Sequence, residues 1–343
     1  MGNFILKAKY NVKYPKVNYI GNKEKLSEWI VQSLPVENGK VLDIFSGGNS
    51  VSFELKKQGF QVYSNDILYA SFVVSKAIIE NNNVLLDEKV IDEALKFKIT
   101  DKQRQSFSWL ENKLYFAEEI DELAQLVLFS ETLDEYSKYL FQALIRRSMI
   151  RKLPYSRMNV PWNNIVKLRD EEYSYEKYGR KRAYHNEKFS DHIRANLYDY
   201  DAAIFDNGLE NKAFQLDALD VIGEIDNVDI IYLDPPYPST MNKYDDFYGA
   251  FDKVFDHNKS HINLTDKTVF LENLEKIIKA AILKTKYVVL SLNSRSKPSI
   301  DEIYDMFSKY GEVSVLKRKH NYQVSGKDNK NENFELLATL EVI

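Results

Sequence analysis

The tetrapeptide Asp234-Pro235-Pro236-Tyr237 places a carboxylate, two prolines and an aromatic ring directly after an apolar run, residues 228–233. Such a run, bounded by a turn signal, predicts a buried β-strand. The prolines fix their own φ angles and lack N–H groups, so the loop is stiff and its carbonyls are free to accept hydrogen bonds. A rigid acceptor pair beside an aromatic face suits a planar group that carries an amine. The alternative is a strand-ending turn with an incidental tyrosine.

A second candidate site follows the predicted strand 40–45, where residues 46–50 read Ser-Gly-Gly-Asn-Ser. Two glycines at a helix start let the backbone approach a ligand closely. Asp66 ends the next predicted strand, 19 residues beyond Gly47. In dinucleotide-binding folds, an acidic residue about 20 positions on accepts hydrogen bonds from ribose hydroxyls. The full glycine pattern of a pyrophosphate cradle is absent, so an adenosine-bearing cofactor without phosphates fits better, with S-adenosylmethionine the obvious case.

Two further charged residues could serve this cofactor. Asp43 at the end of the first strand could take its amino group, and Lys23, which precedes a predicted helix, could reach its carboxylate. The alternatives are a tight strand-to-helix turn with capping carboxylates and, for the lysine, an ordinary solvated charge.

The elements that position these residues alternate between strand and helix at both ends of the chain. A strand, a helix over 51–58 and a second strand over 61–64 form a β-loop-α-β unit, which opens a doubly wound sheet. Apolar spacing is helical over 68–150, whereas residues 151–211 predict loops and short elements. The α/β pattern then resumes and ends in two strands, near 313–318 and 334–342. We therefore expect one α/β body interrupted by an inserted recognition region.

The charge distribution favours a polyanionic partner at the insertion. Residues 146–194 carry 13 Lys and Arg against 6 Asp and Glu, although the whole chain has a net charge of −4. Cations neutralise phosphates, and aromatic rings stack on or wedge between bases. The alternative is an ordinary exposed face. The basic residues include Arg146, Arg147, Arg151, Lys152, Arg157, Arg180, Lys181 and Arg182, interleaved with Tyr155, Trp162, Tyr173, Tyr175, Tyr178, Tyr184 and Phe189.

Composition excludes several other classes of site. The chain of 343 residues has no cysteine, which rules out disulfides, cysteine-ligated zinc and a thiol nucleophile. Its five histidines are scattered through the sequence, so we expect no metal site. No run approaches the ~18 apolar residues of a membrane span, and the N-terminus does not read as a signal peptide. We expect a cytoplasmic protein.

Taken together, these motifs resemble those of the alpha group of S-adenosylmethionine-dependent N6-adenine DNA methyltransferases, which includes Dam-type enzymes and many restriction–modification methylases. The likeness covers both ends of the chain and not its middle. The motifs that carry it are, in the order of that group, Tyr19-Ile20-Gly21-Asn22-Lys23, Asp43-Ile44-Phe45-Ser46-Gly47-Gly48, Asn65-Asp66, Leu216-Asp217-Ala218, Asp234-Pro235-Pro236-Tyr237, Leu290-Ser291-Leu292-Asn293-Ser294 and Glu335-Leu336-Leu337.

The resemblance implies a Rossmann-like methyltransferase fold: a mixed, mostly parallel sheet with helices on both faces and an inserted, largely helical target-recognition region. The expected parts are residues 1–80 for cofactor binding, 81–211 for target recognition and 212–343 for the catalytic loop and closing strands. The cofactor residues that the resemblance implies are Tyr19, Lys23, Asp43, Phe45, Ser46, Gly47, Asp66 and, for the adenine, Asp217. The expected DNA-binding residues are Arg157, Arg180, Lys181, Arg182 and Tyr184.

In the mechanism that the resemblance implies, the Asp234 carboxylate and the Pro235 carbonyl accept the two hydrogens of an adenine amine. Tyr237 stacks on the adenine after the base has left the helix. The expected partners are double-stranded DNA and a cognate restriction endonuclease that acts independently. Two departures stand out: Asn49 replaces a further glycine, for which we expect weakened cofactor binding, and residues 238–240 differ from the Dam-type continuation.

Alternatives stay open within and beyond this class. N4-cytosine DNA methylation uses similar acceptor chemistry, although its signature more often begins with serine. RNA adenine methylation is a second alternative, and a catalytically silent DNA-binding relative is a third. C5-cytosine methylation is excluded, because it needs a thiol nucleophile that the chain lacks.

Overall fold

One seven-stranded sheet forms the body of the molecule, in the order β3-β2-β1-β4-β5-β7-β6. The computed structural model describes residues 9–179, 183–238, 244–295, 297–320 and 333–343. The first five strands run parallel, whereas β7 is antiparallel to both of its neighbours. The strands are β1 (Lys40–Asp43), β2 (Gln61–Asn65), β3 (Lys212–Phe214), β4 (Val228–Leu233), β5 (Thr285–Asn293), β6 (Gly311–Lys319) and β7 (Phe334–Val342). This mixed, mostly parallel sheet confirms the expected fold class.

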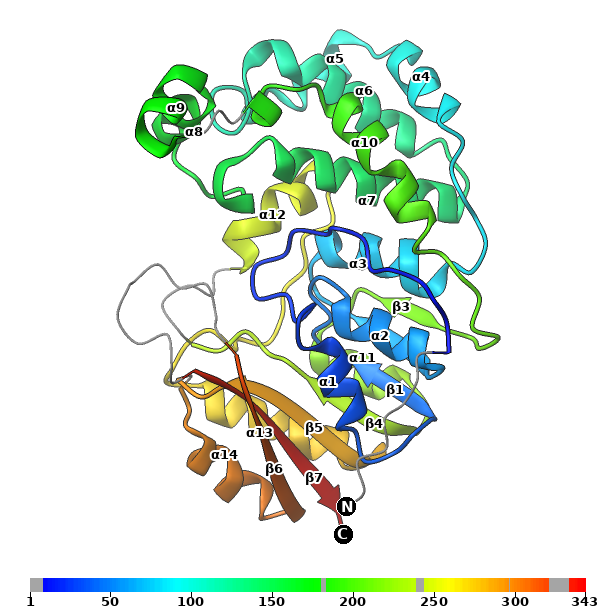
Figure 1. Ribbon diagram of the computed structural model, residues 1–343, viewed down its shortest axis with the longest axis vertical. Helices are drawn as coiled ribbons and strands as arrows, with labels where there is room; N and C mark the ends of the chain where they lie inside the picture. Colours follow the sequence, from blue (N-terminus) through cyan, green and yellow to red (C-terminus); the bar gives the residue numbers. More distant parts are fainter. Residues whose placement is uncertain (1–8, 180–182, 239–243, 296, 321–332) are drawn as a thin grey trace.

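Alternate strand residues supply two separate apolar cores, one on each face of the sheet. Val41 and Ile230 belong to one buried cluster, whereas their chain neighbours Leu42 and Ile231 belong to the other. This is the alternation that a strand buried on both faces requires. The first face is covered by α1 (Ser27–Gln32), α2 (Ser50–Gln58) and α3 (Tyr69–Ser75), and the second by α11 (Ala218–Glu224), α13 (Phe270–Ala281) and α14 (Ile300–Phe307) (Figure 1).

Helix α14, which follows Ser299, begins with a capping box. The hydroxyl of Ser299 accepts a hydrogen bond from the backbone N–H of Glu302 at 3.3 Å, and the Glu302 carboxylate accepts from the backbone N–H of Ser299 at 2.8 Å. The two reciprocal bonds satisfy N–H groups that the helix itself cannot pair.

Between β2 and β3, the described residues form helices. Figure 1 shows that α4 to α10 gather to one side of the sheet, beyond α3 and α12 (Tyr244–Val254). The further elements are a π-helix (Lys76–Glu80), α4 (Lys89–Lys96), α5 (Asp101–Gln105), α6 (Ile120–Ser130), α7 (Glu135–Arg151), α8 (Trp162–Arg169), α9 (Glu171–Tyr178), α10 (Phe189–Asp201) and four 3₁₀ turns (Ser108–Leu110, Ala117–Glu119, Pro154–Ser156 and Ala183–His185).

The prediction of loops and short elements over 151–211 holds for α8 and α9, which have 8 residues each, and is wrong for α10, which has 13. Helix α9 buries only Ser174 along its length, so the apolar spacing that marks a helix is nearly absent from its sequence.

The division of the chain at residues 80 and 211 stays a prediction. One apolar cluster runs without a break from the sheet into α6 and α7.

The strand order creates a switch point between β1 and β4. From β1 the chain adds β2 and β3 on one side, whereas β4 and β5 lie on the other. Ligands of open α/β sheets bind in the crevice outside the carboxyl ends of strands at such a point. Asp43 ends β1 and Asp234 directly follows β4, so both acids stand at this crevice.

Candidate active site

A cavity of about 1170 Å³ opens at the carboxyl ends of the parallel strands. Its walls come from the segment before α1, from the loops after β1 and β2, from the segment around Leu216 and from the loop after β4. The predicted catalytic and cofactor residues that line it are Tyr19, Lys23, Asp43, Phe45, Ser46, Gly47, Asp66, Asp217, Asp234, Pro235, Pro236 and Tyr237. Residues far apart in the sequence thus meet at one site, while their individual roles stay predictions.

Asp43 lines this site and keeps one buried carboxylate oxygen unsatisfied. Its Oδ2 accepts a hydrogen bond from the Ser52 hydroxyl at 2.7 Å. In the part of the chain that the structure describes, its buried Oδ1 has no hydrogen-bond partner, although the backbone N–H of Phe45 lies near enough to lower the pKa of the carboxyl. Burial raises the pKa of Asp43 to about 7, and the bond from Ser52 opposes this shift only in part. A buried carboxylate with a spare acceptor fits a cationic donor such as the ammonium of S-adenosylmethionine.

The loop after β1 is held by Asp66. One oxygen of the Asp66 carboxylate accepts from the Gly47 N–H at 2.8 Å, and the other accepts from the Leu68 N–H at 2.9 Å. Burial raises the pKa of Asp66 to about 6, against these two donors. Gly47 has φ +51°, and a Cβ atom there would lie 2.8 Å from the Tyr19 ring. Both the φ angle and the close approach therefore require glycine at this position.

Asn49, the departure from the family pattern, adopts the left-handed conformation with φ 66°. Its Oδ1 accepts hydrogen bonds from the hydroxyls of Ser64 and Ser75, each at 2.7 Å. Its Nδ2 donates to the Ser71 carbonyl at 3.2 Å. The side chain is fully buried in this network and does not line the cavity. It gives no steric reason for weakened cofactor binding, which stays a prediction.

Tyr19 is fixed by a helix that the sequence-based prediction missed. Its ring stacks on Tyr248 of α12, with centroids 4.8 Å apart and planes inclined by 14°. The Tyr248 hydroxyl accepts from the Ile20 N–H at 2.8 Å, and the Arg146 guanidinium lies 5.3 Å from the Tyr248 ring. The wall of the cavity is therefore positioned from α12 and α7. No local sequence signal connects these segments.

Asp217 caps α11 and also holds the opposite wall of the cavity. Its Oδ1 accepts from the Leu219 N–H at 2.9 Å, and its Oδ2 accepts from the Ile262 N–H at 2.7 Å. The second bond ties the segment before α13 to the cavity. Each carboxylate oxygen keeps a further acceptor site, and the predicted contact of Asp217 with the cofactor's adenine stays a prediction.

Lys23 is ion-paired rather than solvated. Its Nζ lies 3.1 Å from Oδ1 of Asp234 and 3.2 Å from Oε1 of Glu335, and its side chain is only 11% exposed. The solvated-charge interpretation is therefore wrong. These ion pairs favour a role at Asp234 over the predicted contact with the cofactor's carboxylate. Glu335 comes from β7, so the sequence around Lys23 gives no signal for this partner.

Tyr237 is held with its ring in the wall of the cavity. Its hydroxyl donates to the Ser291 carbonyl at 2.7 Å, and its ring centroid lies 5.4 Å from that of Phe270. The side chain is only 7% exposed. The hydroxyl anchor and the neighbouring ring fix the plane of the aromatic ring, which is what a stacking platform needs. Pro235 is buried beside it and Pro236 is half-buried.

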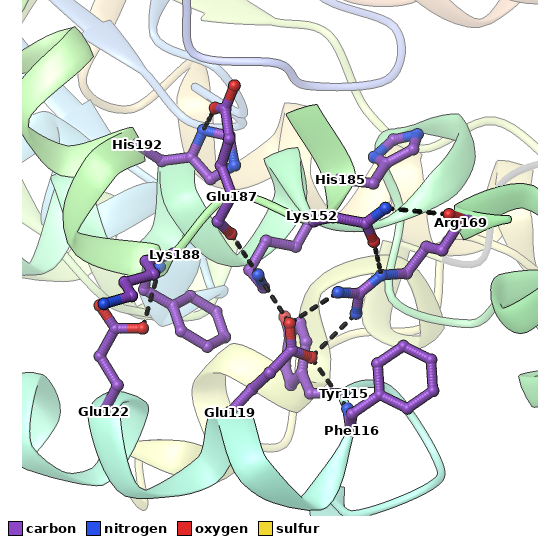
Figure 2. A network of polar contacts seen from close by, with 12 residues as sticks. Tyr115, Phe116, Glu119, Glu122, Lys152, Arg169, His185, Glu187, Lys188 and His192 are labelled. Carbon is purple, nitrogen blue, oxygen red and sulfur yellow. Dashed lines mark hydrogen bonds and ion pairs between the residues drawn. The ribbon is translucent and has the colours of Figure 1, made fainter. Parts of the chain in front are cut away.

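Several cations of the basic segment are buried, which corrects their expected role in contacting phosphates. Arg146, Arg147 and Lys152 are each at most 4% exposed. Figure 2 shows one reason: Lys152 and Arg169 converge on Glu119 from different helices. The Glu119 carboxylate lies 2.7 Å from the Lys152 ammonium and 2.6 Å from the Arg169 guanidinium. These charges hold the insertion together and do not face a partner.

The expected DNA-binding residues divide into three groups. Arg157 is half-buried, with its guanidinium 5.5 Å from the Phe247 ring and 5.7 Å from the exposed Tyr155 ring. Tyr184 is also half-buried and lies under the Arg151 guanidinium at 3.9 Å. Arg180, Lys181 and Arg182 lie outside the described residues.

The strained turn before Arg157 was not singled out from the sequence. Tyr155 and Ser156 are consecutive non-glycine residues with φ angles of 62° and 55°. The Ser156 hydroxyl accepts a hydrogen bond from Nδ2 of Asn18 at 3.1 Å, and Asn18 lines the cavity. Strained backbone of this kind clusters at functional sites.

Comparison with known proteins agrees with this geometry. The family model of the D12 class N6 adenine-specific DNA methyltransferases matches residues 19–323. The chain is 42% identical to the Type II methyltransferase M2.HphI of Haemophilus parahaemolyticus, over 96% of this chain and 99% of that protein. It is 25% identical to the modification methylase StsI of Streptococcus sanguinis, over 95% of this chain and 52% of that protein. The Type II methyltransferase M.NlaIII of Neisseria lactamica is 22% identical, over 95% of this chain and 99% of that protein. The chain therefore belongs to the D12 class N6 adenine-specific DNA methyltransferases.

Proposed function

We propose that the cavity binds S-adenosylmethionine together with an adenine rotated out of duplex DNA, and that Asp234, Pro235, Pro236 and Tyr237 act on the adenine. The observation that carries this proposal is the position of the Asp234 carboxylate. It stands in the same cavity as Asp43, whose buried Oδ1 has no hydrogen-bond partner among the described residues.

The residues of the loop after β4 make the adenine amine reactive. This amine is a poor nucleophile, because its lone pair is conjugated with the ring. The Asp234 carboxylate and the Pro235 carbonyl accept its two hydrogens, which turns the nitrogen toward sp³ geometry and frees the lone pair. Pro236 keeps the loop stiff, and Tyr237 stacks on the base. Positioning and charge stabilisation then perform the catalysis without a covalent intermediate.

Residues of the other strand ends hold the methyl donor. The Asp43 carboxylate accepts a hydrogen bond from the ammonium of S-adenosylmethionine. Asp66 accepts hydrogen bonds from its ribose hydroxyls, and Asp217 accepts one from the amine of its adenine. Gly47 lets the backbone come close to the ligand, and Tyr19, Phe45 and Ser46 complete the wall. S-adenosylmethionine, when bound, supplies an electrophilic methyl group.

The target base reaches this cavity only after it leaves the duplex. Tyr155 and Arg157 lie beside the segment that contains Asn18 at the cavity wall. We assign them to the contact with the opened duplex, where the exposed Tyr155 ring takes the place of the missing base. Tyr184, Arg180, Lys181 and Arg182 complete the proposed DNA-contacting residues, of which the arginines and the lysine neutralise phosphates.

The biological setting follows from the relatives. M2.HphI and M.NlaIII are named as Type II methyltransferases. We propose that this chain protects DNA in a restriction–modification system and that a separate endonuclease cuts the same sequence. Such a role places the protein in the cytoplasm. None of the described helices combines the length and the apolar character of a membrane span.

Transfer of tritiated methyl groups to duplex DNA tests the proposal. Asp234→Ala should lower the transfer rate by at least about 100-fold, the scale at which loss of one preorganised charge-stabilising group acts, while calorimetry finds S-adenosylmethionine binding intact. Asp226→Ala, an exposed acid before the other end of β4, serves as the control and should be fully active. Full turnover by Asp234→Ala would contradict the proposed catalytic role of Asp234. Parallel assays with RNA and with DNA that contains cytosine but no adenine test the alternative substrates. Neither should accept label.

A further inference from the structure

Glu335 is a buried carboxylate that the proposed reaction leaves without a role. It is the second residue of β7, fully buried between β5 and β6. Its Oε1 accepts a hydrogen bond from the Ser291 hydroxyl and lies 3.2 Å from Nζ of Lys23. Among the described residues no donor reaches its Oε2. A half-satisfied buried carboxylate is costly to a fold, so its presence beside the cavity needs a reason.

Lys23 connects this carboxylate to the catalytic one. Its ammonium lies between Asp234 and Glu335 at nearly equal distances, 3.1 and 3.2 Å. Burial would lower the pKa of Lys23, but the two carboxylates outweigh burial and raise it well above its ordinary value. Lys23 therefore stays a cation, and one positive charge is shared by two acids.

The three groups carry a net charge of −1 in a buried setting, which makes their protonation sensitive to each member. Burial raises the pKa of Asp234, and Lys23 opposes this shift. Burial also raises the pKa of Glu335, with Lys23 opposing and Asp234 adding to it. The other titratable groups that act on the three are Asp43 from β1, Tyr232 from β4, Tyr237 from the following loop and His320 after β6.

We infer that Glu335 is a positioning residue that holds Lys23 midway, so that Lys23 keeps Asp234 ionised without taking over the oxygen that the adenine amine needs. This inference rests on the proposed role of Asp234. Methylation of the amine would form one N–C bond as the S–C bond of the methyl donor breaks and leaves its electron pair on sulfur, and the nitrogen would release one proton, which Asp234 accepts. Without the negative charge of Glu335, Lys23 would pair with Asp234 alone and make it a weaker proton acceptor. Without the positive charge of Lys23, Asp234 would stay protonated at higher pH.

The two partners therefore predict opposite changes in the pH profile of single-turnover methyl transfer. Glu335→Gln should move the acid limb of the rate to lower pH and lower the plateau rate. Lys23→Met should move the acid limb to higher pH. Each shift should be about one pH unit, the scale on which a charge within ~4–6 Å changes a carboxyl pKa. The affinity for S-adenosylmethionine, measured by calorimetry, should stay at the wild-type value in both variants.

A matched control variant and a second variant that alters the surroundings of Glu335 complete the test. Glu341 lies on the same strand as Glu335, and its ion-pair partner Lys286 is at the surface. The pH profile of the Glu341→Gln variant should equal that of the wild type. If Glu335→Gln does not fold, Ser291→Ala replaces it, since removing the hydroxyl donor favours neutral Glu335 and should also shift the acid limb downward.

The outcomes separate the inference from the proposed function. If Asp234→Ala abolishes transfer while Glu335→Gln, or its substitute, and Lys23→Met keep the wild-type profile, the inference is overturned and the function stands. Weaker S-adenosylmethionine binding by Lys23→Met would likewise overturn it, in favour of a cofactor contact. Full activity of Asp234→Ala overturns both.

Discussion

Asp43 ends β1 directly beside Tyr232 of β4, its partner in the parallel register. Asp234 follows two residues after Tyr232, so the acid proposed for the methyl donor and the acid proposed for the adenine stand at neighbouring strand ends. The two strands meet at the switch point of the sheet, where helices diverge to opposite faces and leave a crevice. The fold alone thus brings the two proposed ligand sites to one place.

A first prediction concerns the charge of Asp43. Because burial raises its pKa to about 7, the ligand-free carboxyl is largely neutral in mild acid. The ammonium of S-adenosylmethionine needs the ionised form, so affinity should rise as pH increases through that value, up to the pH of about 8 at which an α-ammonium itself deprotonates. Calorimetric titrations across this range measure the effect. Asp43→Asn should weaken binding by about 10–100-fold, the loss expected for one charge-assisted hydrogen bond, and should remove the pH dependence. A persistent pH dependence in the variant would assign it to another group.

A second prediction separates backbone strain from close approach at Gly47. Gly47→Ala places a methyl group in the left-handed region and 2.8 Å from the Tyr19 ring. Gly208→Ala, with φ +74° and open space around the added atom, is the matched control. Gly208→Ala should lose about 1 kcal/mol of unfolding free energy through strain, as chemical denaturation measures. Gly47→Ala should lose more, because its methyl group also clashes with the Tyr19 ring. Only Gly47→Ala should also weaken S-adenosylmethionine binding. Equal affinity in the two variants would contradict the proposed role of this glycine.

The strand ends and their acids were predictable because each depends on a short segment. An apolar run followed by a carboxylate identifies Asp43 and Asp234 without knowledge of the rest of the chain. The parallel sheet then gathers these residues at one edge. The same reasoning could not find Glu335 or Tyr248. Their partners Lys23 and Tyr19 lie near the other end of the sequence, and only tertiary packing brings them together.

The basic insertion was misjudged for a related reason. Lysine and arginine are seldom buried without a partner, so a cluster of them predicts a surface. Arg169 and Lys152 find that partner in Glu119, which precedes them on another helix. Apolar spacing also failed in α9, because this helix has little contact with a core.

A third prediction concerns this buried network (Figure 2). Glu119→Gln leaves Lys152 and Arg169 as uncompensated buried cations, so the free energy of unfolding should fall by about 3–5 kcal/mol. Burial opposes ionisation of Glu119, but Arg169 and Lys152 outweigh it and lower its pKa. The stabilisation is therefore present above the ordinary carboxyl pKa and is lost as pH falls through the lowered one. Chemical denaturation in acid and at neutral pH should show the variant and the wild type converging in acid.

The control for this network is Glu88→Gln. Glu88 pairs with Arg194 at 2.8 Å, but its side chain is 64% exposed. Surface pairs of this kind contribute about 0–1 kcal/mol. A loss from Glu88→Gln as large as that from Glu119→Gln would mean that burial does not explain the difference.

The last prediction treats Tyr155 as a residue whose strain serves DNA opening. Its φ of 62° costs an L-residue about 1–3 kcal/mol, and its ring is 55% exposed. Tyr155→Gly removes both the strain and the ring. The free energy of unfolding should stay equal or rise slightly, while methyl transfer to duplex DNA falls. Tyr198→Ala, which removes an 81% exposed ring from α10, should change neither.

The substrate can show whether the ring acts on base opening. Sequencing of DNA modified by the wild type, with a readout for methyladenine, supplies the recognised sequence. In a duplex of that sequence with no base opposite the target adenine, the adenine is already unpaired and leaves the helix at lower cost. This substrate should restore much of the Tyr155→Gly rate while changing the wild-type rate little. If the variant is equally slow on both duplexes, Tyr155 contributes to binding and not to the opening of the base pair.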